Sequence, residues 1–83
     1  MSTNLYVGNL AFGTSSADLE KLFAQHGEVA SAQVIVDRET GRSRGFGFVE
    51  MPDAASARQA IAALDGHDFD GRALKVNIAR KRT

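Results

Sequence analysis

The sequence contains no cysteine in its 83 residues and no long apolar segment. Without cysteine the chain can form neither a disulfide framework nor a cysteine zinc site, which suits the reducing cytoplasm. No apolar run approaches the roughly 20 residues that a transmembrane helix requires. Residues 1–4 carry no basic patch leading into an apolar run, so we expect no signal peptide. These absences predict a cytoplasmic protein with no metal or other cofactor and no membrane partner. The length of 83 residues allows one domain at most.

The chain also lacks net charge, because ten basic side chains balance ten acidic ones. This balance at first argues against a strongly charged partner such as nucleic acid. The charges are unevenly spread, however. Residues 75–83 carry +4 and residues 37–44 carry +1, which leaves −5 for the remainder. We therefore expect a molecule that is basic around one face and acidic behind it, with few contacts to phosphate and moderate binding.

The segment 44–51, RGFGFVEM, is the most informative stretch of the chain. The strand period of two places Phe46 and Phe48 on one face and Val49 and Met51 on the other. If the aliphatic face is the core, two aromatic rings lie where an antiparallel sheet normally has polar side chains. Two interpretations are open: a second layer or a dimer interface covers the rings, or the rings are stacking platforms for nucleic-acid bases. The interleaved glycines favour platforms, because glycine in a strand often marks the close approach of a ligand.

Two motifs carry a family resemblance. Segment 44–51 matches seven of the eight positions of the signature K/R-G-F/Y-G/A-F-V-x-F/Y, with Met51 as the departure. Segment 5–10, LYVGNL, resembles the second signature of the same family, with Tyr6 at its stacking aromatic. Over Leu5 to Arg80 the chain therefore resembles the RNA recognition motif family. It looks like the small stand-alone RNA-binding proteins of bacteria and cyanobacteria, and like the corresponding domain of plant glycine-rich RNA-binding proteins.

Periodicity and capping signals give the order of the elements. Ser15, with Asp18 three residues later, predicts the start of a helix that Gly27 ends. Asp53 predicts the start of a second helix. The expected elements are a strand over 5–10, a helix over 16–26, strands over 29–37 and 44–51, a helix over 54–64, an irregular stretch over 67–72 and a strand over 74–79.

The order strand, helix, strand, strand, helix, strand is the split βαβ pattern of the α+β, ferredoxin-like sandwich. Right-handed crossovers put both helices on one face of the sheet. Topology and resemblance together predict a four-stranded antiparallel sheet of strand order 4-1-3-2. The chain is expected to form a single domain over 1–83, with a core of about 4–80 and a short basic tail. The side chains expected to face the core are Leu19, Leu22, Phe23, Ala32, Val34, Val36, Ala57, Ala60, Ile61, Leu64, Leu74, Val76 and Ile78.

The opposite, open face is the expected site. The resemblance implies that Tyr6 and Phe48 each stack beneath a base, while Phe46 packs between two sugars. It also implies that Arg44 pairs with phosphate. Base edges are then read by side chains on the flanking strands, Gln33, Lys75 and Asn77, and by the backbone after Ala79.

Other residues border this face. Ile35 lies beside the rings as a further contact surface, although a single exposed apolar residue needs no explanation. Arg42 in the loop over 37–43 either reaches phosphate or is a solvated loop charge. The tail residues Arg80, Lys81 and Arg82 lie at the edge of the platform.

The predicted function is therefore non-catalytic binding of single-stranded RNA by a monomer. Single-stranded DNA is an open alternative, because only contacts to the 2′-hydroxyl distinguish the two. A peptide-binding module of the same fold is a second alternative, but its pattern Arg-x-Phe is replaced here by Arg72-Ala73-Leu74. An enzyme is not expected, because no histidine–carboxylate pair has a convincing spacing and no glycine-rich loop precedes a helix.

Overall fold

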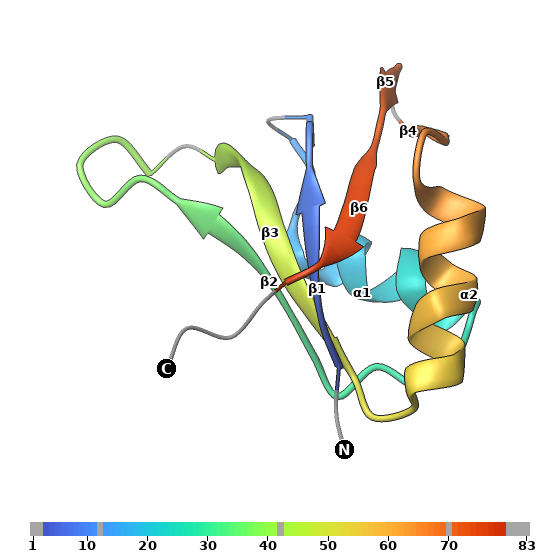
Figure 1. Ribbon diagram of the computed structural model, residues 1–83. Helices are drawn as coiled ribbons and strands as arrows, with labels where there is room; N and C mark the ends of the chain where they lie inside the picture. The colour runs from blue at the N-terminus through green and yellow to red at the C-terminus, as the bar shows by residue number, and fades with distance from the viewer. Residues whose placement is uncertain (1–2, 12, 42, 70, 80–83) are drawn as a thin grey trace.

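The computed structural model describes residues 3–11, 13–41, 43–69 and 71–79, and of Ser43 and Arg44 it describes the backbone. Two helices and six strands follow one another along the described part of the chain (Figure 1). They are β1 (Thr3–Gly8), α1 (Ser16–Ala24), β2 (Ser31–Val36), β3 (Ser43–Met51), α2 (Ala54–Leu64), β4 (Asp68–Phe69), β5 (Arg72–Ala73) and β6 (Lys75–Ile78).

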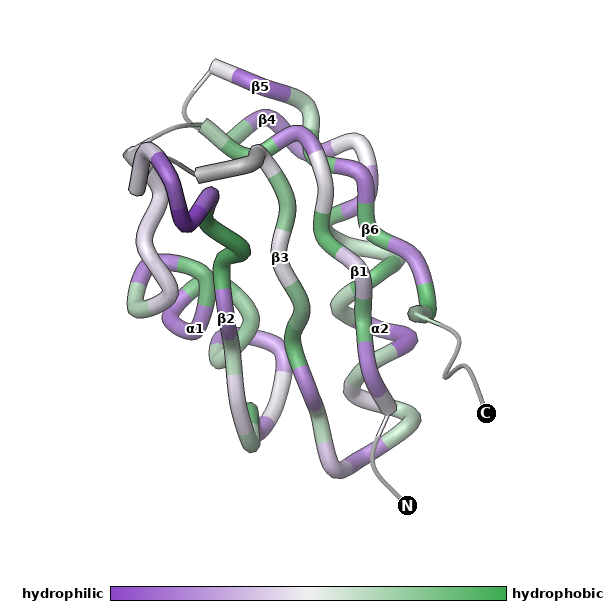
Figure 2. The backbone as a smooth tube through the Cα atoms, turned by 90° about the vertical axis from the view of Figure 1, so that its left-hand side faces the viewer, coloured by the Kyte–Doolittle hydropathy of each residue, from purple (hydrophilic) through white to green (hydrophobic). Residues whose placement is uncertain are grey.

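Four of the strands form one antiparallel sheet in the order β2-β3-β1-β6 (Figure 2). Counted along the predicted strands, this is the order 4-1-3-2, so the predicted ferredoxin-like fold is confirmed. Both helices lie on the same side of the sheet, with α1 over β2 and β3 and α2 against β1, β3 and β6 (Figure 1). The other face of the sheet has no layer over it in the described part of the chain.

The two helices begin where the sequence predicts. The Ser15 hydroxyl accepts from the Asp18 N–H, and the Asp18 carboxylate accepts from the Ser15 N–H, both at 3.1 Å. At α2 the Asp53 carboxylate accepts from the Ser56 hydroxyl at 2.9 Å and from the Ala55 N–H at 3.3 Å. The bonds from the Asp18 and Ala55 N–H groups satisfy donors that the first turn of a helix leaves without partners.

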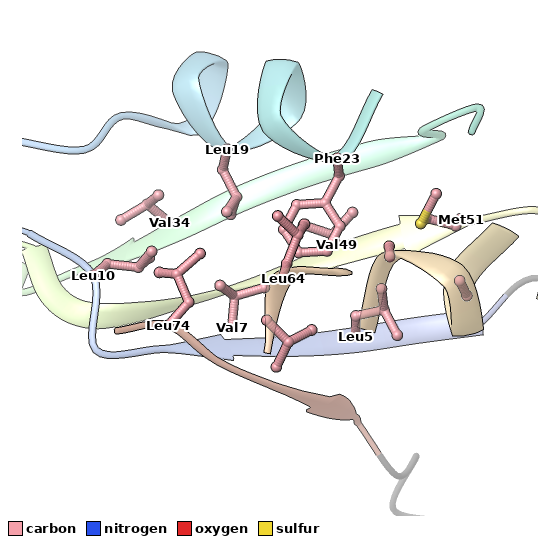
Figure 3. Close-up of a cluster of buried hydrophobic side chains, with 13 residues drawn as sticks. Leu5, Val7, Leu10, Leu19, Phe23, Val34, Val49, Met51, Leu64 and Leu74 are labelled. Atoms are coloured by element: carbon pink, nitrogen blue, oxygen red, sulfur yellow. The ribbon is translucent and has the colours of Figure 1, made fainter. Parts of the chain in front are cut away.

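The core fills the space between the helices and the sheet (Figure 3). Leu19 and Phe23 point from α1 toward Val49 of β3, and α2 contributes Leu64 and two buried alanines. Most of the side chains predicted to face the helices are buried, including Val34, Leu74 and Val76; Leu22, Ala32 and Ile61 are half-buried and pack against the others.

Two residues predicted to face the core are exposed. Val36 is 51% exposed because the pairing of β2 with β3 shifts register between Val34 and Val36, where the hairpin runs past the helices. Ile78 is 56% exposed at the end of the edge strand β6, although it pairs with the buried Leu5. At both positions the alternation of the strand predicts a side chain that faces the helices, but neither α1 nor α2 covers it.

The ends of five predicted elements also differ. The first helix ends at Ala24, two residues earlier than predicted, and β3 begins one residue earlier, at Ser43. The first strand stops at Gly8, because Asn9 has a left-handed backbone with φ 62°. The second strand and the last one are shorter than predicted, at Ser31–Val36 and Lys75–Ile78. The stretch over 67–72 is not irregular throughout, since β4 and β5 pair as a small hairpin.

The start and the end of the sheet are joined. The Ala79 N–H donates to the Asn4 carbonyl at 2.8 Å, directly beyond the pairing of β1 with β6. This bond ties the last described residue of the chain to the first strand.

Candidate nucleic-acid interface

Three aromatic rings gather at the centre of the open face. Tyr6 on β1 pairs directly with Phe48 on β3, and Gly8 pairs with Phe46, so the register brings the rings together. Their centroids lie 5.9 Å apart for Tyr6 and Phe46, 6.1 Å for Tyr6 and Phe48, and 6.0 Å for the two phenylalanines. Phe48 is 39% exposed, and the other two rings are half-buried.

The ring planes are not all parallel. Tyr6 and Phe46 are stacked with 30° between their planes. Phe48 meets Tyr6 at 64° and Phe46 at 85°, in the edge-to-face arrangement that aromatic pairs favour. The cluster therefore offers ring faces in two different orientations.

The structure places the predicted polar residues on both flanks of the rings. Gln33 on β2 pairs with Phe48, and Asn77 on β6 pairs with Tyr6; both are exposed. Lys75 is exposed on β6, opposite Gly8. Ile35, also on β2, is half-buried. Amide groups thus stand on either side of the rings, where they can both donate and accept hydrogen bonds.

For several predicted site residues the structure does not describe the side chain. Arg42, Arg80, Lys81 and Arg82 lie outside the described residues. Arg44 lies in β3, and its side chain is likewise outside the description.

A polar brace at the end of β1 was missed by the sequence analysis. The Asn9 side-chain amide donates to the Ala73 carbonyl at 2.8 Å, and the Arg72 guanidinium donates to the Asn9 side-chain oxygen at 3.2 Å. The next residue, Leu10, donates its N–H to the Gly45 carbonyl at 2.8 Å. The loop after β1 is thus held between β3 and the β4–β5 hairpin. Asparagine tolerates the left-handed backbone, but no sequence signal reports partners more than 60 residues away.

Among the described residues, the carboxylates with shifted pKa values lie at the helix starts. Hydrogen bonds from the backbone and then the side chain of Ser15 lower the pKa of Asp18. The Ser56 hydroxyl and the Ala55 N–H lower the pKa of Asp53. Both groups stabilise helix N-termini, so these shifts indicate capping and not acid–base chemistry.

Two other features are absent from the described residues, a metal-binding cluster and a membrane-spanning helix. No group of three histidine, aspartate or glutamate side chains gathers there in a way that could hold a metal ion. Neither α1 nor α2, the helices that the structure describes, is long and apolar enough to cross a membrane.

Comparison with known proteins gives a family match. The model of the RNA recognition motif matches residues 5–75. The chain is 53% identical over 79 residues to a putative RNA-binding protein, RbpE, of the cyanobacterium Nostoc, covering 95% of this chain and 80% of that one. It is 57% identical over 79 residues to the chloroplastic RNA-binding protein CP31B of Arabidopsis thaliana, covering 95% of this chain and 27% of that protein. The chain thus spans about a third or less of the length of such chloroplast relatives.

Solved structures of similar proteins agree with this family match. The crystal structure of RNA-binding protein PG1 is 54% identical and superposes with a TM-score of 0.93, covering 98% of both chains. The Rna15 RNA recognition motif, solved with bound RNA of sequence GU, is 27% identical with a TM-score of 0.85, covering 94% of this chain and 83% of that one.

Proposed function

Because this chain belongs to the RNA recognition motif family, we propose that it binds single-stranded RNA on the open face of its sheet, without catalysing a reaction. The observation that carries the proposal is the cluster of Tyr6, Phe46 and Phe48, whose centroids lie 5.9–6.1 Å apart on the face without helices. Aromatic rings on such a face are suited to stack unpaired bases.

The ring orientations favour an unpaired strand. Successive bases of a double helix stack nearly parallel to one another, whereas the planes of Tyr6 and Phe48 differ by 64°. Bases that lie on these two rings must therefore be splayed apart. Only a strand that is free of its complement can adopt that arrangement, since a base must leave its stack to reach a ring.

The flanking polar groups complete the proposed site. Gln33 and Asn77 stand beside the stacking positions and can hydrogen-bond base edges, and Lys75 can contact either a base or a phosphate. The roles proposed for Arg44, Arg42 and the basic tail rest on the family resemblance and on their charge.

The size of the platform suggests moderate affinity. Stacking contributes about 1–3 kcal/mol per base, and two stacked bases must offset the entropy of association. We expect a Kd of about 1 μM, near −8 kcal/mol. With roughly three or four phosphates neutralised, log K should fall with log salt at a slope of about −2 to −3.

The test is a titration of short mixed-sequence RNA and matched DNA followed by fluorescence anisotropy. Wild type is compared with a Phe46→Ala/Phe48→Ala double variant, whose fold is checked by circular dichroism. The proposal predicts RNA binding near micromolar for wild type and almost none for the folded double variant. Equal binding by both, or none by wild type, would show that the ring cluster serves something else, such as a protein partner.

The chain provides a second, local readout. It contains one tyrosine and no tryptophan, so tyrosine emission reports on Tyr6 alone. A base stacked on this ring should quench the emission in step with the anisotropy change. Emission that stays constant while anisotropy rises would place RNA away from the platform.

The state and location of the protein belong to the same proposal. We propose a monomer in the cytoplasm, a reducing compartment that suits a chain without cysteine. Sedimentation of the free protein and microscopy of a fluorescent fusion test these two points. Preference for RNA over DNA is read from the paired titrations.

A further inference from the structure

Gly8 is an unusual residue on the open face. It lies two positions after Tyr6 on β1, so a side chain at this position would point to the same face as the Tyr6 ring. It is nevertheless buried, although neither α1 nor α2, the helices of the described chain, covers this side of the sheet. What covers Gly8 is the Tyr6 ring itself.

The contacts are specific to that ring. A β-carbon built on Gly8 would lie 2.6 Å from the Tyr6 hydroxyl oxygen, 2.9 Å from Cε1 and 3.0 Å from Cζ, and these are its three nearest neighbours. Distances under 3.0 Å are too short for carbon, so an added methyl group and the present ring position exclude each other. The ring therefore lies along the strand over a residue that has no side chain.

We propose that Gly8 is a positioning residue for Tyr6. Because the position carries no β-carbon, the ring lies down over β1, where it stacks with Phe46 at 30° and leaves a face for a base. An alanine here lifts or turns the ring and breaks the Tyr6–Phe46 stack, while leaving the fold in place. This inference rests on the proposed function, since it assigns Gly8 to the same RNA platform.

A purely structural role would require a different environment. The left-handed backbone that favours glycine occurs at Gly45 and Gly71 but not at Gly8. The atoms nearest to the added β-carbon are the far end of a movable side chain and not backbone. The backbone therefore accepts alanine, and the cost falls on the orientation of one ring.

The test is Gly8→Ala, with Gly13→Ala as the matched control. A β-carbon on Gly13 meets nothing within 4 Å, and its backbone is not left-handed. We expect Gly8→Ala to keep the thermal transition of wild type, to change the tyrosine emission and near-ultraviolet circular dichroism of the free protein, and to bind RNA about five- to tenfold more weakly, part of one stacking contribution. Gly13→Ala should match wild type in all three.

A double-variant cycle with Tyr6→Ala separates positioning from other effects. If Gly8 acts through the ring, Gly8→Ala has no further effect on RNA affinity once the ring is removed. A loss of the same size in both backgrounds, or unchanged emission and affinity in Gly8→Ala, overturns the inference. If Gly8→Ala fails to fold, Gly8→Ala/Tyr6→Ala decides: folding of the double variant supports the ring contact, and unfolding overturns it. If wild type binds no RNA, the proposed function fails, but the spectra of the free proteins still test the ring position.

Discussion

The two faces of the sheet contain glycines for opposite reasons. A β-carbon on Gly47 would point toward the helices and lie 2.5 Å from the Gln33 carbonyl oxygen and 3.2 Å from Leu19. On the open face, a β-carbon on Gly8 would meet only the Tyr6 ring within 3.0 Å. The first glycine lets β2 and α1 close on β3, and the second lets a ring lie on the surface. The helix-covered face thus determines stability, whereas the open face presents a surface at little cost to the fold.

The largest effect should come from a core ring on the helix-covered face. Phe23 is fully buried, so Phe23→Ala should lower the free energy of unfolding by about 3–5 kcal/mol through lost burial and a cavity. This is a large share of the stability of a small domain. Urea denaturation followed by circular dichroism measures it. A loss below about 1 kcal/mol would contradict the assignment of Phe23 to the core.

Gly47→Ala tests the glycine on the same face. The added methyl group meets backbone and a packed leucine, so we expect a loss of about 1–3 kcal/mol from overpacking. In a domain of this size this corresponds to a fall in Tm of roughly 10 °C. Thermal unfolding of Gly47→Ala and Gly8→Ala, measured side by side, sharpens the comparison, because only the Gly47 variant should unfold at a lower temperature than wild type. Equal melting of the two would remove the distinction between the faces.

Phe48→Ala removes a phenylalanine ring from the open face, as Phe23→Ala removes one from the core. The ring is 39% exposed, so its removal should change the free energy of unfolding far less than the loss of Phe23 does. RNA affinity should fall by about 1–3 kcal/mol, the contribution of one stacked base. Paired denaturation and anisotropy titrations measure both quantities. A variant that binds like wild type but unfolds easily would assign Phe48 to the fold and not to the platform.

The smallest effect concerns the helix caps. The pKa values of Asp18 and Asp53 are lowered in the folded state, so the stabilisation that they provide is present above the unfolded value of 3.8 and is lost as pH falls through the folded value. Asp18→Asn/Asp53→Asn should therefore lose less stability than wild type between about pH 5 and pH 2. Urea denaturation across this range is the measurement. RNA affinity at pH 7 serves as the control and should not change.

The pattern of the sequence was enough to predict the face on which most of the core side chains lie. Alternation in β3 separated Phe48 from Val49, and the Ser15–Asp18 spacing marked the start of α1. Alternation does not report whether a helix reaches a given position, and this is why Val36 and Ile78 were placed in the core but are exposed. Whether a helix covers a given strand position depends on the lengths and the relative tilt of the helices and the sheet, which arise only when the chain folds.

The parts of the site that were not predicted depend on distant partners. Asn9 and Arg72 meet across 63 positions, and their contact depends on how the β4–β5 hairpin folds back toward β1. Two strands of two residues are too short to show a period in the sequence. The position of the Tyr6 ring over Gly8 was also missed. The strand period of two predicts which side chains share a face, but not the direction in which a ring lies on that face.

The bond from the Ala79 N–H to the Asn4 carbonyl brings both ends of the folded unit to one corner of the sheet. Chains with adjacent ends tolerate being cut elsewhere and rejoined at those ends. A short linker from residue 79 to residue 3, with new ends opened between residues 38 and 41 in the exposed β2–β3 loop, should give a circular permutant with the same order of strands in space. The unit can equally be carried within a longer polypeptide, whose flanking segments would enter and leave at that one corner.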